Sequence, residues 1–151
     1  MVTETRVIGI GNAFRGDDGV GLFVARQLRE LNLPGVSVLE QSGEGVELME
    51  AWGDATQVII VDALSSGGEP GSIHRIEAAG QPLPDIFSGH STHAFSLREA
   101  IELARQLDRL PAQLVVYGIE GKSFELSRGL SPEVEAAAGL LTEQIAKELG
   151  R

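Results

Sequence analysis

The sequence predicts an α/β fold, in which a mostly parallel, twisted five-stranded sheet lies between helices on both faces in a single three-layer α/β/α domain covering residues 1–151. The length of 151 residues fits one compact domain. Strand-like and helix-like segments alternate along the chain, which favours parallel strands joined by crossover helices. The segment 58–61 reads Val-Ile-Ile-Val, and a run without polar residues is typical of a parallel strand covered on both sides.

The first half of the chain alternates between short apolar runs and amphipathic segments. Residues 6–10 form a β-branched run stopped by Gly11 and Asn12, which predicts a buried strand. Val20, Val24, Leu28 and Leu31 recur at helical spacing and predict a helix over 19–31. The next expected elements are a strand at 36–39, a short helix at 46–52 and the central strand at 57–63.

The second half begins with residues 72–76, whose alternating character predicts an edge strand. Ser96 and Glu99 have the spacing of a capping box, which predicts a helix from there to about residue 107. Residues 114–119 form a further apolar strand. Ser131 stands as a cap residue before Pro132 at the first position of a last helix.

The expected topology places the first strand between the second and the third. In such sheets, sites lie at the carboxyl edge, in the crevice where the strand order reverses. The first and third strands are therefore expected to frame the functional site.

Composition excludes several functions. A net charge of −10 disfavours nucleic acid and anionic membrane surfaces as partners. The absence of cysteine excludes disulfides, thiolate nucleophiles and Cys-ligated metals. No basic leader and no long apolar run are present, so a cytoplasmic, soluble protein is expected.

Several common site motifs are incomplete. Gly9 and Gly11 begin a dinucleotide-binding pattern, but Phe14 stands where its third glycine belongs. Gly11 and Gly16 have P-loop spacing, but Asp17 replaces the lysine that would hold phosphate. Neither a Gly-x-Ser-x-Gly elbow nor a His-Glu-x-x-His motif occurs.

The remaining candidates are acids and histidines expected at the carboxyl edge. Asp17 and Asp18 follow the first strand, where helix capping and function are equally good explanations. Asp62 ends the central strand, and a buried carboxylate there needs a partner or a cation. His90 and His93 precede the third long helix. Carboxylates with one imidazole suit zinc, nickel or manganese and leave coordination positions open.

The order of short motifs resembles the hydrogenase maturation endopeptidase family over nearly the full length. The opening motif is fairly specific to this family, and the ordered set is highly specific. The matching stretches are Gly9-Ile10-Gly11-Asn12, Asp17-Asp18-Gly19-Val20-Gly21, Val61-Asp62-Ala63, Ser91-Thr92-His93, Tyr117-Gly118-Ile119-Glu120 and Gly129-Leu130-Ser131-Pro132. Two departures are present: some relatives have glutamate in place of Asp18, and residues 40–45 replace an Asp-Gly-Gly-Thr turn.

The resemblance implies a twisted sheet flanked by helices and a metal-contacting triad of Asp18, Asp62 and His93. It also implies one endoproteolytic cut that removes the C-terminal extension of a [NiFe] hydrogenase large-subunit precursor after nickel insertion. The precursor is then the partner, and its nickel, rather than an organic cofactor or a resident metal, is what the triad recognises.

Two alternatives stay open: a hydrolase with its own tightly bound metal, and a non-catalytic chaperone that binds nickel or the precursor. A protease without an obvious side-chain nucleophile requires an activated water, for which Asp17 or Asp18 could act as the base.

Overall fold

A computed structural model describes residues 4–42, 45–88 and 96–150. The elements in chain order are β1 (Thr5–Ile10), η1 (Gly16–Gly19), α1 (Val20–Glu30), β2 (Val36–Gln41), α2 (Gly45–Trp52), β3 (Gln57–Leu64), β4 (Ile73–Glu77), η2 (Asp85–Ser88), α3 (Leu97–Gln106), β5 (Gln113–Glu120) and α4 (Pro132–Glu148). The predicted five-stranded α/β fold is confirmed, with most boundaries within one or two residues. The main difference is that a 3₁₀ turn, η1, precedes the first helix.

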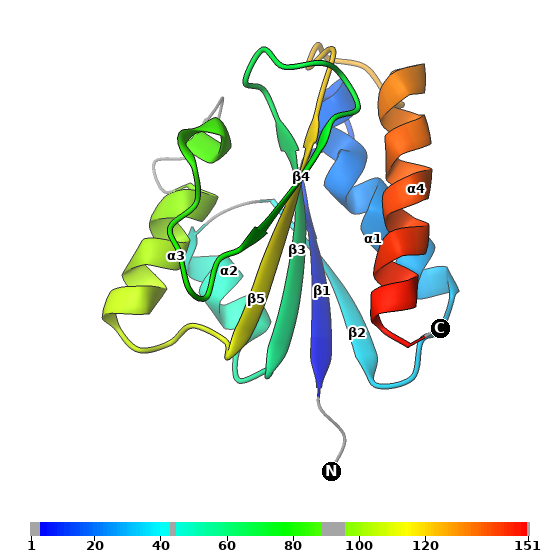
Figure 1. The fold of residues 1–151 in the computed structure, drawn as a ribbon. Helices are drawn as coiled ribbons and strands as arrows, with labels where there is room; N and C mark the ends of the chain where they lie inside the picture. The colour runs from blue at the N-terminus through cyan, green and yellow to red at the C-terminus, as the bar shows by residue number, and fades with distance from the viewer. Residues whose placement is uncertain (1–3, 43–44, 89–95, 151) are drawn as a thin grey trace.

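The sheet has the strand order β2-β1-β3-β5-β4, in which β4 alone runs antiparallel. β1 lies between β2 and β3, as predicted, so the strand order reverses there. Figure 1 shows α1 and α4 on one face of the sheet, and α2 and α3 on the other.

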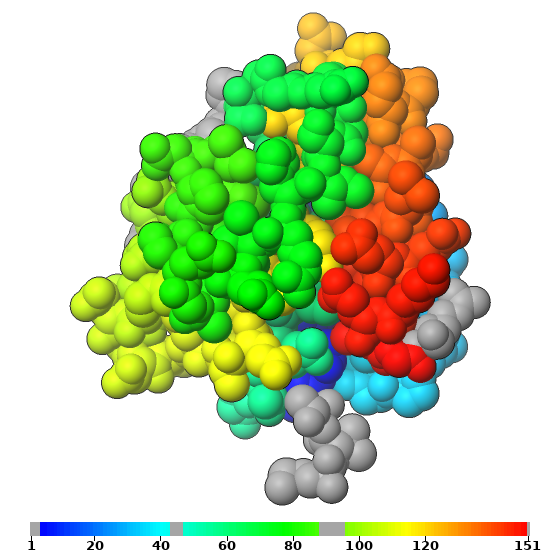
Figure 2. All heavy atoms as spheres, in the orientation of Figure 1, coloured from blue at the N-terminus to red at the C-terminus, as the bar shows by residue number. Residues whose placement is uncertain are grey.

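Two apolar layers hold the helices to the sheet, because successive side chains of a strand point to opposite faces. Ile8, Ile60 and Val116 pack with α2 and α3. Val7 and Ile59 pack with α1 and α4. In the space-filling view, atoms of the segment around β4 and η2 cover the front of the molecule between α3 and α4 (Figure 2).

Within the described ranges, no helix combines the length and the apolar character needed to cross a bilayer.

Candidate active site

The glycines of the opening motif fix where the turn after β1 lies. A Cβ atom added to Gly9 would lie 2.3 Å from the carbonyl oxygen of Gly21, and one added to Gly21 would lie 2.3 Å from that of Val61. α1 therefore packs directly on the backbones of β1 and β3. A Cβ on Gly11 would lie 2.0 Å from the carbonyl oxygen of Asp18. These close approaches hold the turn at the carboxyl edge, beside the ends of β1 and β3.

Asp17 is fully buried and saturated with hydrogen bonds. Its Oδ2 accepts from the backbone N–H groups of Lys122 (2.7 Å) and Ser123 (3.0 Å) and from the Ser131 hydroxyl (2.7 Å). Its Oδ1 accepts from the Ser131 N–H at 2.7 Å. Burial by itself would raise the pKa of Asp17, but the bonds from Ser131, Ser123 and Lys122 hold it below its usual value. This geometry suits an anchor for the 121–131 segment.

The helix-capping expectations have different outcomes. α1 begins after Gly19, and no side chain caps it, so neither Asp17 nor Asp18 serves as its cap. Ser131 occupies the N-cap position of α4 before Pro132, as predicted, but its hydroxyl donates to Asp17 and makes no capping bond. By contrast, Ser96 caps α3 as predicted, accepting from the Glu99 N–H at 3.3 Å.

Asp18 and Asp62 form a pair of acids at the carboxyl edge. Asp18 is partly exposed, and its Oδ2 accepts from the Asn12 N–H at 3.0 Å. Asp62 also retains some exposure near the end of β3, and its Oδ1 accepts from the Ala63 N–H at 2.8 Å. Burial of the carboxyl group and, second, the negative charge of Asp18 raise the pKa of Asp62 to about 7. The structure thus brings together two acids that the sequence places 44 positions apart.

The third predicted metal contact, His93, lies outside the described residues, as does His90. Asp62 shares a sheet face with Ile60 and Leu64, the face covered by α2 and α3. Within the described ranges, no group of three His, Cys, Asp or Glu side chains is arranged to hold a metal ion. The donor chemistry of the acid pair fits a cation, because a divalent ion would relieve the repulsion between Asp18 and Asp62.

Comparison with known proteins decides the family. Residues 23–148 match the sequence model of a family described as hydrogenase maturation protease. The chain belongs to this family. The predicted family and its enzyme class, a protease that hydrolyses peptide bonds, are therefore confirmed.

Relatives agree over nearly the whole chain. An inferred hydrogenase maturation protease from Methanocaldococcus jannaschii is 33% identical over 95% of this chain and 94% of its own length. The hydrogenase maturating endopeptidase HybD from E. coli superposes with a TM-score of 0.81 at 25% identity, covering 97% of this chain and 91% of its own. The [NiFe] hydrogenase maturation protease HycI from Thermococcus kodakarensis gives 0.75 at 30% identity, covering 99% and 94%.

Another acid of this protease lies at the same edge and is not among the predicted site residues. Glu120 ends β5, is 1% exposed, and accepts bonds from the N–H (2.8 Å) and the hydroxyl of Ser66. It therefore ties the loop after β3 to β5. The sequence feature that could have identified Glu120 is the same as for Asp62, namely an acid at the end of an apolar strand.

The turn that departs from the family pattern is tied to α1 at its start. Glu40 accepts bonds from Arg26 (2.8 Å) and Arg29 (2.8 Å), and these two guanidiniums hold the pKa of Glu40 below its usual value despite its partial burial. Its carboxylate thus stabilises the contact between β2 and α1.

Proposed function

We propose that this protease removes the C-terminal extension of a [NiFe] hydrogenase large-subunit precursor after nickel insertion. The observation that carries the proposal is the Asp18–Asp62 pair at the edge between β1 and β3, within the fold of a hydrogenase maturation protease. The description of the T. kodakarensis relative as a [NiFe] hydrogenase maturation protease supports the class of substrate.

Asp18, Asp62 and His93 are the proposed contacts to the nickel carried by the precursor. Two carboxylates and one imidazole are donors that nickel accepts, and they leave coordination positions for ligands supplied by the precursor. The two acids repel each other in the free enzyme. A precursor loaded with nickel would relieve that repulsion, whereas an empty precursor would not. Tight binding would then depend on completed metal insertion.

The cut itself requires a water molecule and a group that accepts its proton. The oxygens of Asp17 already accept four hydrogen bonds, which disfavours that residue as the base. Asp18 is better suited as the base, because its carboxylate lies at the same edge with partial access to solvent.

The test is cleavage of purified precursor, prepared with and without nickel and followed by intact-mass spectrometry. We expect the nickel-loaded form to lose its C-terminal extension and the nickel-free form to remain intact. Equal cleavage of both forms would reject nickel gating. A stoichiometric metal in the purified enzyme that is required for activity would indicate a self-contained metallohydrolase, and binding without any cleavage would indicate a chaperone.

A further inference from the structure

Two segments distant in sequence form one ledge beside the acid pair. The ledge comprises residues 12–16 and 121–131. Arg15 and Ser127 form an isolated parallel bridge, the Ser127 N–H donates to the Phe14 carbonyl at 3.0 Å, and the Gly16 N–H donates to the Ser127 carbonyl at 3.0 Å. Together with the bonds to Asp17, these contacts make the ledge a continuation of the turn that carries Asp18.

The ledge exposes large apolar side chains. Phe14 is 56% exposed and Leu126 is 78% exposed. The Arg128 guanidinium carbon lies 4.8 Å from the centroid of the Phe14 ring, a cation–π arrangement that holds both groups at the surface. Single exposed leucines are ordinary on a protein surface, but an aromatic, a leucine and an arginine together match the composition of protein-binding hot spots.

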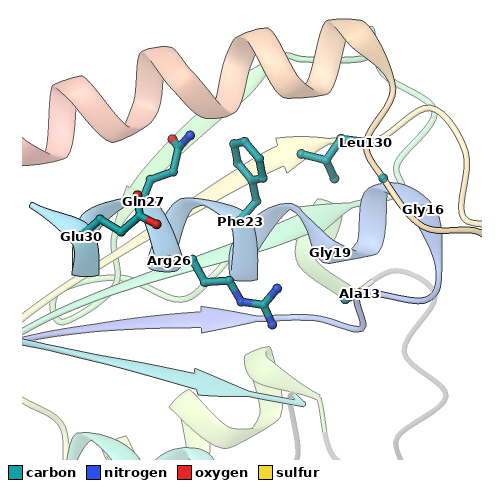
Figure 3. Close-up of a pocket in the computed structure, with 9 residues that line it drawn as sticks. Ala13, Gly16, Gly19, Phe23, Arg26, Gln27, Glu30 and Leu130 are labelled. Atoms are coloured by element: carbon teal, nitrogen blue, oxygen red, sulfur yellow. The ribbon is translucent and has the colours of Figure 1, made fainter.

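A pocket opens between the ledge and α1. Its volume is about 380 Å³, and the ledge residues Ala13, Gly16 and Gly129 form part of its wall. Figure 3 shows the side chains of Phe23 and Leu130 directed toward each other across it. Arg26, Gln27 and Glu30 of α1 line the rest of the pocket, so its apolar part lies at Phe23 and Leu130, next to the ledge. A pocket of this size, apolar on the ledge side, suits a side chain of a partner protein.

The charged side chains of the ledge are Arg15, Lys122, Glu125 and Arg128, all exposed, so positive charge predominates there. The protein carries a net charge of −10, yet neither Arg15 nor Arg128 forms an ion pair with any carboxylate of the described ranges. By contrast, Arg26 at the pocket is paired with Glu40. Two unpaired guanidiniums beside exposed apolar groups are complementary to a segment that carries a carboxylate next to an apolar side chain.

We propose that the ledge and its pocket are the docking surface for the hydrogenase precursor, which places an apolar side chain in the pocket and a carboxylate against Arg128. The proposal rests on the proposed function and extends it by naming where the precursor binds. Because the ledge continues into the turn that carries Asp18, docking there would deliver the scissile region to the acid pair.

The test compares affinities for the purified, nickel-loaded precursor by calorimetry and, separately, kcat and KM for cleavage. Phe14→Ala, Leu126→Ala and Arg128→Glu should each weaken binding about tenfold, the loss expected for a hot-spot side chain, with kcat nearly unchanged. Leu140→Ala is the matched control, since Leu140 is 65% exposed on α4. Added salt should weaken binding of the wild-type protein and have less effect on Arg128→Glu.

The outcomes separate this proposal from the proposed function. Cleavage by the wild type with unchanged affinity of all three ledge variants would overturn the docking surface and leave the function standing. Binding that the ledge variants weaken, without cleavage by the wild type, would support the docking surface and reject the protease function. Absence of binding by the wild type would overturn the docking surface. Circular dichroism of each variant checks that a loss of affinity does not come from unfolding.

Discussion

Two carboxylates of the same sheet edge have opposite environments. Asp17 sits under the 121–131 segment, where three N–H groups and a hydroxyl converge on it and hold its pKa below the usual value. Asp62 lies beside Asp18 with a bond from the Ala63 N–H, and its pKa rises to about 7. Burial pushes both pKa values upward, so the difference comes from the four bonds donated to Asp17 and from the negative charge of Asp18 beside Asp62. The first environment stabilises the fold, and the second suits chemistry.

The largest expected effect is the loss of activity in Asp62→Asn. Removing a proposed metal contact should lower kcat/KM for the nickel-loaded precursor by at least about 100-fold. The melting temperature should stay equal or rise, because the variant removes a charge that Asp18 repels. Cleavage kinetics measure kcat/KM, and calorimetry measures the melting temperature. Asp54→Asn, at an exposed position, is the matched control. Near-normal cleavage by Asp62→Asn would contradict the functional role that the contrast with Asp17 assigns to Asp62.

Asp17→Asn should destabilise the protein, in contrast to Asp62→Asn. An amide cannot accept all four bonds, and its NH₂ group would face a donor, so the free energy of unfolding should fall by about 2–4 kcal/mol. Urea denaturation measures the change against the Asp54→Asn control. A loss below about 0.5 kcal/mol, the scale of ordinary surface substitutions, would contradict the anchoring role.

The two acids should also give the stability opposite dependences on pH. The lowered pKa of Asp17 means that its contribution is present above its unfolded value of about 3.8 and is lost as the pH falls through the folded value. The raised pKa of Asp62 means that ionisation destabilises the fold as the pH rises from about 3.8 to about 7.

Urea denaturation at pH values from below 3.8 up to about 7 checks both signs. The stability advantage of Asp62→Asn over the wild type should grow as the pH rises toward 7, whereas the deficit of Asp17→Asn should shrink below about pH 4. If the stability advantage of Asp62→Asn does not vary with pH, the pKa of Asp62 is not raised in the folded protein.

The smallest expected effect is that of Ser131→Ala. This change removes the hydroxyl bond to Asp17 but keeps the Ser131 N–H bond, so the free energy of unfolding should fall by about 1 kcal/mol. A double-mutant cycle with Asp17→Asn measures the coupling. Full additivity of the two changes would indicate that the hydroxyl does not act through Asp17.

Local patterns were sufficient for much of the fold. The apolar run at 58–61 and the helical spacing after Gly19 predicted a parallel sheet with β1 at its switch point. The structure has the mostly parallel sheet and places β1 between β2 and β3. The acids at the ends of β1 and β3 could be found for the same reason, since parallel strands bring their carboxyl ends to one edge. His93 lies outside the described residues, so its place in the triad stays a prediction.

The sequence by itself determined the family, the order of the elements and the edge at which the acids gather, because periodicity and short motifs are local properties of the chain. Only the tertiary structure decided which of the adjacent acids Asp17 and Asp18 is the anchor. The donors to Asp17 come from residues 105 to 114 positions later, and no spacing within the opening motif reports them. The ledge and its pocket were likewise decided in three dimensions, since they exist only where residues 12–16 meet the 121–131 segment. Hydrogen bonds and solvent exclusion depend on neighbours in space, and the fold alone determines those neighbours.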